Sequence, residues 1–227
     1  ITCRDWSSDV CSSDLSGYDI GISLKGFNVT YPNCIKNLLD SNSISTCADA
    51  ISLELAPMNS ISNNMLSAFS ANGIKVLSSN LNSITNNIFS NDTGEGILLD
   101  QSFGCAVSGN AFSSNNNTGR DIHLHGESSG DNQSKYHSIC GNSVFHQDPT
   151  PGVSDSHVGV YLEDYSLLNA VAGNSFSFDS PYNPTCIDED PVVDGAGNNL
   201  IAGNIVYHAT GTPIDSNTTT IVADNKS

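Results

Sequence analysis

The sequence predicts an all-β protein folded as a right-handed parallel β-helix, a solenoid of about seven to eight stacked coils. Three observations support this prediction. Two short elements alternate along the chain and recur many times, and the apolar residues inside them follow a period of two. In addition, no stretch of the chain has the 3.6-residue spacing of an amphipathic helix of useful length.

The first repeated element joins two apolar positions through a turn dipeptide that ends in Asn. Its six copies begin at Ile61, Ile84, Val107, Ile139, Val171 and Ile201, spaced by 23, 23, 32, 32 and 30 residues. Cys34–Asn37 is interpreted as a degenerate first copy. The dipeptides start with Asn or Gly, at Asn63, Asn86, Gly109, Gly141, Gly173 and Gly203. These residue types enter the left-handed backbone region at low cost, so each copy predicts a tight turn.

The second residue of every dipeptide is Asn, and the repeat places these residues in one line. We expect an amide ladder along the solenoid from Asn64, Asn87, Asn110, Asn142, Asn174 and Asn204. A ladder of this kind satisfies turn backbone groups that would otherwise be unpaired in the interior.

The second repeated element has the form Gly-Ile-x-Leu. Its copies are Gly21–Leu24, Ala50–Leu53, Gly73–Val76, Gly96–Leu99, Asp121–Leu124 and Gly159–Leu162. The alternation of aliphatic and other residues is typical of strands. Because no hairpin partner follows, each strand is expected to pair with its equivalent one coil away.

With these repeats, residues 17–225 resemble the pectin-lyase-like right-handed β-helix proteins. The resemblance implies an extracellular or surface location, on a cell or a virion, and a polysaccharide partner. It does not imply one activity, because the fold hosts glycoside hydrolases, polysaccharide lyases, phage tail-spikes and non-catalytic repeat proteins. A hydrolase and a structural or adhesive repeat protein therefore stay open as alternatives.

Some enzyme motifs of that family are missing. The pectin-hydrolase patterns Asn-Thr-Asp, Asp-Asp, Gly-His-Gly and Arg-Ile-Lys do not occur, and His125-Gly126 is only a fragment of the third. Lyases of this fold usually need a basic residue as base, with Ca²⁺ held by acidic side chains. Arg120 and Lys75 are the basic residues expected near the exposed face, so the lyase interpretation is weakened.

The outward positions of the Gly-Ile-x-Leu strands form two columns. The first reads Ser23, Ser52, Lys75, Leu98, His123 and Tyr161, and the second reads Lys25, Glu54, Leu77, Asp100, His125 and Glu163. Coils stack about 4.8 Å apart, which places Asp100 and Glu163 about 10 Å apart with His125 between them.

This spacing suggests an inverting glycosidase, in which one carboxyl group is the acid and the other activates water. We take Asp100 and Glu163 as the catalytic pair, assisted by His125. The expected substrate-binding residues are His123, Tyr161, Lys75 and Arg120.

Other interpretations of the same residues remain. An exposed sheet face must be polar, so solvated surface alone is sufficient to explain the cluster. His123 and His125, with Asp100 or Glu163, could also hold a metal ion. The acidic run Asp188–Asp190 reads as a solvated loop, with a Ca²⁺ site as the alternative.

Insertions point to the same face. Extra residues at about 126–135, 147–157 and 179–191 fall beside the strands of this sheet. Since long loops on rigid scaffolds often carry function, they are expected to wall a groove over Asp100, His125 and Glu163.

Charge and hydropathy exclude two partner classes. The formal charge is −17 and no basic stripe offsets it, so nucleic acid is not expected as a partner. No stretch approaches the about 20 apolar residues of a membrane-spanning helix. The cysteines lack CxxC spacing, which favours buried free thiols such as Cys105, with a Cys34–Cys47 disulfide as an alternative.

The N-terminal segment differs from the rest. Residues 4–15 resemble the conceptual translation of a sequencing-library adaptor, so residues 1–15 are separated from the β-helix domain at 16–227. This boundary implies an N-terminally truncated chain. A first coil without a cap would expose strand edges, which predicts self-association into homo-oligomers.

Overall fold

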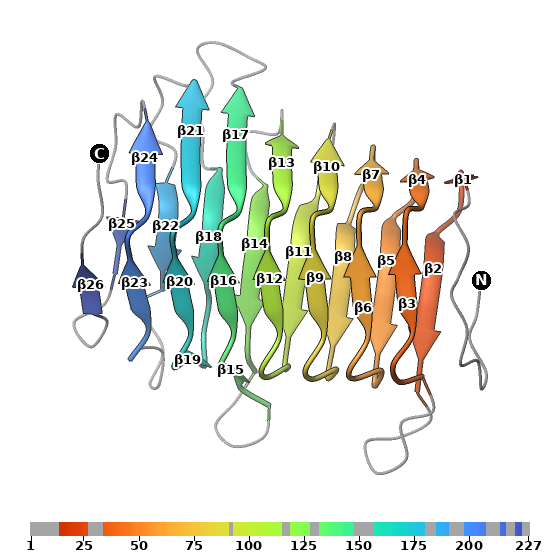
Figure 1. The fold of residues 1–227 in the computed structure, drawn as a ribbon, viewed down its shortest axis with the longest axis horizontal. Helices are drawn as coiled ribbons and strands as arrows, with labels where there is room; N and C mark the ends of the chain where they lie inside the picture. The colour runs from red at the N-terminus through yellow and green to blue at the C-terminus, as the bar shows by residue number, and fades with distance from the viewer. Residues whose placement is uncertain are drawn as a thin grey trace.

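The computed structural model describes residues 14–26, 34–90, 93–114, 119–127, 132–147, 157–179, 185–190, 198–207, 214–216 and 221–223. Within these ranges every regular element is a β-strand, and the strands form three eight-stranded parallel sheets wound into a solenoid (Figure 1). The right-handed parallel β-helix is therefore confirmed, with one strand per sheet in each of eight coils. No helix among the described residues is long and apolar enough to span a bilayer.

The strands of each sheet follow one another along the solenoid axis. Sheet A consists of β2 (Ile20–Lys25), β5 (Asp49–Glu54), β8 (Asn72–Leu77), β11 (Glu95–Asp100), β14 (Arg120–His125), β18 (Val158–Leu162), β22 (Thr185–Glu189) and β25 (Ile214–Asp215). Sheet B consists of β3 (Leu38–Asp40), β6 (Ser60–Ser62), β9 (Ser83–Thr85), β12 (Ala106–Ser108), β16 (Ser138–Cys140), β20 (Ala170–Ala172), β23 (Leu200–Ala202) and β26 (Ile221–Ala223). Sheet C consists of β1 (Asp14–Ser16), β4 (Ser43–Ser45), β7 (Met65–Ser67), β10 (Ile88–Ser90), β13 (Ala111–Ser114), β17 (Ser143–Gln147), β21 (Ser175–Asp179) and β24 (Ile205–Tyr207). A small fourth sheet pairs β15 (Ser134–Lys135) with β19 (Ser166–Leu167).

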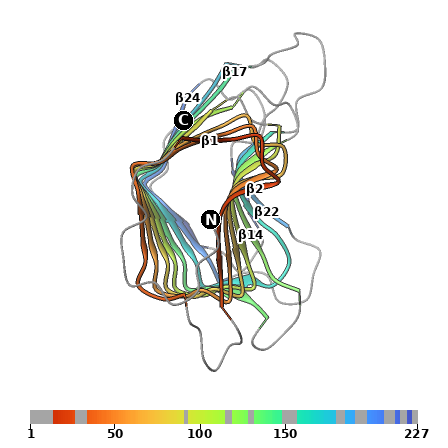
Figure 2. The ribbon, with the colours of Figure 1, turned by 90° about the vertical axis from the view of Figure 1, so that its right-hand side faces the viewer.

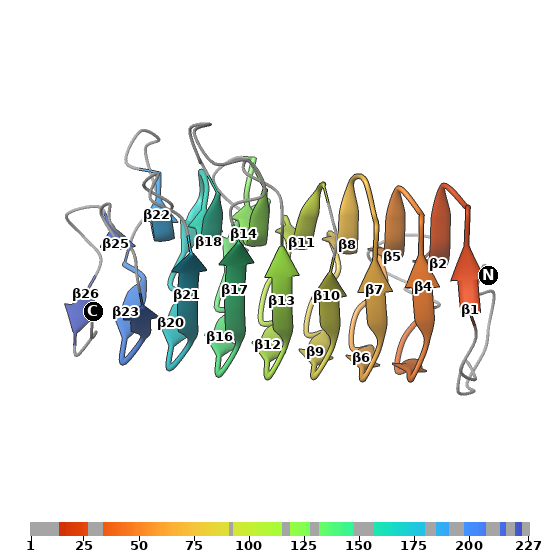
Figure 3. The same ribbon diagram turned by 90° about the horizontal axis from the view of Figure 1, so that it is seen from above.

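The core is the inside of this three-sided tube, which Figure 2 shows along the axis and Figure 3 from above. Equivalent aliphatic residues of successive coils are paired in register, for example Ile97 with Ile74 and Ile122. These side chains are fully buried. Phe89 and Phe112 stack at 4.6 Å between ring centroids on the sheet C side of the core. Each coil thus buries its apolar side chains only by lying on the next one.

The predicted asparagine ladder is present. From coil to coil, the side-chain oxygen of one Asn accepts hydrogen bonds from the backbone and side-chain nitrogens of the Asn before it, at 2.8–3.0 Å. The residue before each Asn has a positive φ, as expected for Asn63, Asn86, Gly109, Gly141, Gly173 and Gly203. The ladder starts one coil earlier than predicted, at Asn42, which follows Ser41 at φ 57°.

The interpretation of Cys34–Asn37 as the first copy of this element is wrong. Asn37 belongs to a second ladder on another corner of the tube, where it donates to Asn59 at 2.8 Å. Asn59 in turn donates to Asn82 at 2.8 Å. The two corners carry similar turn chemistry, so the sequence alone did not separate them.

In the second ladder, Cys105 and His137 replace asparagine. His137 is buried, accepts the Cys105 backbone N–H at Nδ1 (3.1 Å) and lies with Nε2 3.0 Å from the Ser102 carbonyl oxygen. Burial lowers the pKa of His137 to about 4.

Cys105 is buried as expected and, like Cys34 and Cys47, is a free thiol, so no Cys34–Cys47 disulfide is formed.

Strand β1 includes Asp14 and Leu15, which the sequence assigns to the adaptor-like segment. Asp14 pairs with Ser43 and Leu15 pairs with Ile44 of β4, and Leu15 packs against the core. Residues 1–13 lie outside the described part of the chain.

Replacing Asn110 by Ala should lower the free energy of unfolding by about 2–4 kcal/mol, because the Asn87 nitrogens and the Ile84 carbonyl oxygen would lose buried partners. Denaturant unfolding measures the change. Asn86→Gly is the control, since Asn86 is exposed and Gly adopts its left-handed conformation freely. An Asn110→Ala protein as stable as this control would contradict the structural role of the ladder.

His137 should also make the fold sensitive to acid. Its folded-state pKa of about 4 lies below the ordinary 6.5, so the unfolded chain takes up the proton first. The contribution of the buried, neutral His137 to the free energy of unfolding is therefore fully present above pH 6.5. As the pH falls toward 4, this contribution is lost, and the free energy of unfolding drops by about 3 kcal/mol. His137→Asn, which restores the ladder amide, should remove this component when unfolding is measured from pH 7 to 4. An identical pH dependence in both proteins would refute the assignment.

Candidate functional site

The outer face of sheet A has the two columns that the sequence predicts. Leu98, His123 and Tyr161 are paired in register on β11, β14 and β18. Asp100 is paired with His125, and Glu163 directly follows the last residue of β18. Asp100, His125 and Glu163 therefore occupy equivalent outward positions of successive coils.

His123 lies between two carboxylates. Its Nε2 is 2.7 Å from Glu163 Oε2, and its Nδ1 is 2.9 and 3.0 Å from the two carboxylate oxygens of Glu95. The histidine is only 6% exposed, whereas the Glu163 side chain keeps 29% of its surface accessible. Glu163 is thus the most accessible member of the triplet, ahead of Glu95, whose side chain is 20% exposed.

Arg120 and Tyr161 complete one side of this triplet. The Arg120 guanidinium donates to Glu95 at 2.9 Å and lies 4.3 Å from the centroid of the Tyr161 ring. The Tyr161 and His123 rings lie 5.3 Å apart. Three of the four residues expected to bind substrate, His123, Tyr161 and Arg120, therefore lie together in this cluster.

His125 forms a second pair beside it. Its Nδ1 is 2.9 Å from Asp100 Oδ1, and its Nε2 is 3.8 Å from Asp164 Oδ2. The His125 side chain is 26% exposed, more than that of Asp100 at 17%. Asp100 holds the ring, and the ring faces solvent.

These contacts raise the pKa values of the two histidines and lower those of Glu95 and Glu163. Burial opposes the charge of His123, but its hydrogen bonds to Glu163 and Glu95 outweigh burial and raise the pKa of His123. The hydrogen bond from His123 lowers the pKa of Glu163. Burial would raise the pKa of Glu95, yet contacts with His123 and Arg120 lower it. The hydrogen bond to Asp100 raises the pKa of His125.

The acidic run Asp188–Asp190 is not a solvated loop, and that interpretation is wrong. Asp188 and Glu189 belong to β22, where Asp188 pairs with Tyr161 in the first outward column. Glu189 is buried and accepts a hydrogen bond from Asn199 at 2.6 Å. Burial, together with the charges of Asp215 and Asp190, raises the pKa of Asp188.

Glu95, Asp164 and Asp188 were missed by the sequence analysis. A strict period of two would place Glu95 on the inside with Ile97, but Gly96 and Ile97 both face inward. A Cβ on Gly96 would lie 2.4 Å from the Asp121 carbonyl oxygen and 2.7 Å from the Phe112 ring. The repeated Gly was the available signal that the alternation shifts at this point and turns the preceding residue outward.

Lys75 lies in the first column, but Leu98 separates it from His123. The insertions expected at about 126–135, 147–157 and 179–191 include residues 128–131, 148–156, 180–184 and 191, which lie outside the described residues, so the walls of a groove stay a prediction. Residues 185–189 of the third insertion form β22.

Replacing Glu95 by Gln should lower the pKa of His123, because burial would no longer be offset by this carboxylate. An NMR titration of the imidazole measures the change. Glu54→Gln is the matched control on the same sheet: Glu54 pairs with Lys25 at 2.7 Å, and the change should leave the pKa of His123 unaltered. A His123 pKa unchanged in Glu95→Gln would contradict the role given to Glu95.

The fold of the chain is similar to that of an enzyme of known structure. The crystal structure of DFA-IIIase from Arthrobacter chlorophenolicus A6 in complex with DFA-III matches 93% of this chain and 58% of its own, with a TM-score of 0.51 and 16% identity. The same enzyme in complex with GF2 matches 93% and 59%, with a TM-score of 0.43 and 15% identity. At this identity the likeness concerns the fold alone, and the chain spans less than two thirds of that enzyme. No curated protein sequence matches the chain.

A family described as "Periplasmic copper-binding protein (NosD)" matches residues 8–183. Copper sites use His, Cys or Met ligands. The described residues contain no group of three or more His, Cys, Asp or Glu side chains that could hold a metal ion. Both ring nitrogens of His123 are already engaged by carboxylates. The described residues therefore do not fit a copper site. The family match covers more than half of the sequence, so the chain belongs to the NosD family.

Proposed function

We propose that this protein binds a polysaccharide on the outer face of sheet A and hydrolyses its glycosidic bonds with a pair of carboxyl groups. The observation that carries the proposal is the placement of two carboxyl groups one coil apart on the outer face of sheet A, with Glu163 held by His123 at 2.7 Å and Asp188 paired with Tyr161. The pKa of Glu163 is lowered and that of Asp188 is raised. Two carboxyl groups tuned apart in this way are suited to act as base and acid.

The distance between these two residues supports inversion. Leu162 pairs with Glu189, so Asp188 lies one coil along the axis and two residues back from the position opposite Glu163. A coil spacing of about 4.8 Å and two residues of strand separate their backbones by about 8 Å. Inverting glycosidases hold their carboxyl groups about 6.5–9.5 Å apart, a separation that two side chains on backbones with this spacing can reach.

The residues have separate roles in this reaction. Glu163 takes a proton from a water molecule, whose oxygen forms the new bond to the anomeric carbon. Asp188 gives its proton to the leaving oxygen as the glycosidic bond breaks. His123 positions Glu163. Asp100, which the sequence analysis paired with Glu163, is given a positioning role here: it holds His125 near Glu163, where the His125 charge helps to lower the pKa of Glu163.

The substrate class follows from charge and surface chemistry. A chain with a formal charge of −17 repels polyanions, so a neutral polysaccharide is favoured. Tyr161 and Arg120 are placed to contact the sugar beside the carboxyl groups, and Lys75 lies farther along the same column. The fold similarity to a DFA-IIIase and the description of the NosD family as periplasmic support a carbohydrate-related role in an extracytoplasmic location.

A non-catalytic structural or adhesive role is the alternative. It is favoured by the hydrogen bonding of the cluster, in which His123 is saturated by Glu95 and Glu163 and could simply stabilise the sheet. The two functions differ in whether turnover occurs.

The test is a screen of neutral polysaccharides for release of reducing ends. Glu163→Gln and Asp188→Asn should each lower the rate by at least about 100-fold, because each removes a proton-transfer group. Asp100→Asn should have a smaller effect, and Glu54→Gln on the same sheet should have none. No turnover by the parent protein would reject the hydrolase proposal, and turnover unaffected by Glu163→Gln and Asp188→Asn would reject the assignment of these residues.

The pH dependence checks the assignment of acid and base. Activity needs Glu163 ionised and Asp188 protonated. It should therefore fall when the pH drops through the lowered pKa of Glu163, and also when the pH rises through the raised pKa of Asp188. Residual activity of Glu163→Gln should lack the acidic limb, and that of Asp188→Asn should lack the basic limb. Limbs that persist in both variants would contradict the assignment.

A further inference from the structure

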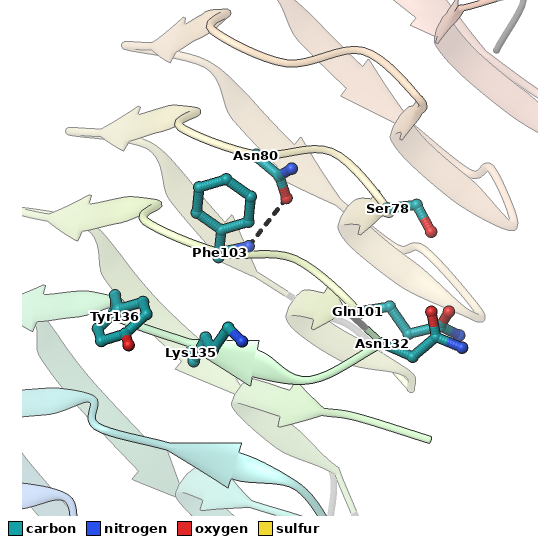
Figure 4. A pocket seen from close by; sticks show the side chains of 7 residues that line it. All are labelled: Ser78, Asn80, Gln101, Phe103, Asn132, Lys135 and Tyr136. Carbon is teal, nitrogen blue, oxygen red and sulfur yellow. Dashed lines mark hydrogen bonds between the residues drawn. The ribbon is translucent and has the colours of Figure 1, made fainter. Parts of the chain in front are cut away.

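A groove with a volume of about 640 Å³ lies at the corner where the strands of sheet A end. None of its lining residues belongs to the carboxylate–histidine cluster, which consists of Glu95, Asp100, His123, His125 and Glu163. Its lining consists of Ser78, Asn80, Gln101, Phe103, Asn132, Lys135 and Tyr136. Figure 4 shows Phe103, Lys135 and Tyr136 toward one end of the groove and Ser78, Gln101 and Asn132 toward the other.

The groove begins where the cluster ends. Gln101 directly follows Asp100, and its backbone N–H donates to the carbonyl oxygen of His125 at 2.9 Å. Phe103 is three residues beyond Asp100, which limits the separation of their backbones to about 11 Å. A ligand lying across the cluster can therefore continue into the groove over a short distance.

The lining chemistry differs from the surrounding acidic surface. Among the described residues Lys135 is the one charged group of the lining, and its ammonium group donates to Gln133 at 3.1 Å and lies 6.0 Å from the Tyr136 ring centroid. No carboxylate of the described residues lines the groove, although the chain carries a formal charge of −17. The remaining polar lining groups are amides and a hydroxyl, which hydrogen-bond neutral hydroxyl-rich ligands.

Two aromatic rings are presented in this groove. Phe103 is 41% exposed and Tyr136 is 57% exposed. The Phe103 backbone N–H donates to the Asn80 side-chain oxygen at 3.0 Å, and Phe103 pairs with Lys135 of the next coil, which holds the two rings on adjacent coils. Aromatic faces carry a negative potential that attracts the C–H groups of a sugar ring. The combination of aromatic faces and a few polar groups in a concave site is typical of small-ligand sites.

From these observations we infer that the corner groove is a binding subsite for a neutral oligosaccharide segment. Phe103 and Tyr136 form the platform, and Gln101 and Asn132 contact the sugar at the end nearest the cluster. The inference rests on the proposed function in one respect, namely that the bound segment is part of the polymer that crosses sheet A. Binding in the groove itself does not require catalysis.

Affinity gel electrophoresis tests this subsite without turnover. The gels contain dextran, inulin, laminarin, xyloglucan or galactomannan, and the protein tested is the Glu163→Gln, Asp188→Asn variant, which lacks both proposed proton-transfer groups, so that the polymer is not degraded during the run. This variant should be retarded by at least one polymer. Adding Phe103→Ala and Tyr136→Ala should weaken the apparent affinity at least tenfold.

The matched control removes two equally exposed aromatic rings elsewhere. Phe145 and Tyr207 lie on sheet C and are 44% and 51% exposed, and replacing both by Ala should leave the retardation unchanged. Circular dichroism confirms that all variants remain folded. Equal retardation with and without Phe103 and Tyr136, or no retardation by any of the five polymers, would overturn the subsite. Retention of aromatic-dependent binding in a parent protein that cuts no polymer would reject the hydrolase proposal but not the subsite.

Discussion

The hydrogen bonding of each coil to the next is the constraint on which the rest of this structure depends. In the described part of the chain no strand has a hairpin partner, and each strand pairs in parallel with its equivalent one coil away. The two asparagine ladders extend this pairing through the turns, where ordinary strand pairing stops. As a result, residues that recur once per coil are held in columns, on the inside as a stacked core and on the outside as lines of chemical groups.

The candidate site follows from that arrangement. A column brings together side chains that are tens of residues apart in the chain, such as His123 and Glu163, which are 40 residues apart and 2.7 Å from each other. The partly buried position of His123 would favour its neutral form, but two carboxylates reverse the effect. The same contacts lower the pKa of Glu163, whereas burial and the nearby acidic groups raise the pKa of Asp188. The outer face of sheet A thus carries one carboxyl group with a lowered pKa and one with a raised pKa.

The corner groove adds a different chemistry next to this acidic face. Its aromatic and amide lining contrasts with a cluster composed largely of carboxylates and imidazoles. The two areas share a boundary at Asp100 and Gln101, so an extended ligand could contact both. In the function we propose, the sheet supplies the groups for proton transfer, and the corner supplies contacts that hold a neutral chain in place.

The sequence by itself determined the coil repeat, the inward aliphatic columns, the ladder from Asn64 to Asn204 and the outward columns that contain Asp100, His123, His125, Tyr161 and Glu163. These features depend on spacing along the chain, which a regular solenoid converts directly into position. Only the tertiary structure decided which side chains meet across coils. It turned Glu95 outward at the Gly96 shift, placed Asp188 in a strand where its charges suggested a loop, and moved Asn37 into a second ladder. It also brought Phe103 and Tyr136 together at a corner. Such contacts depend on local breaks in alternation and on the reach of side chains between coils, and a repeat pattern does not contain that information.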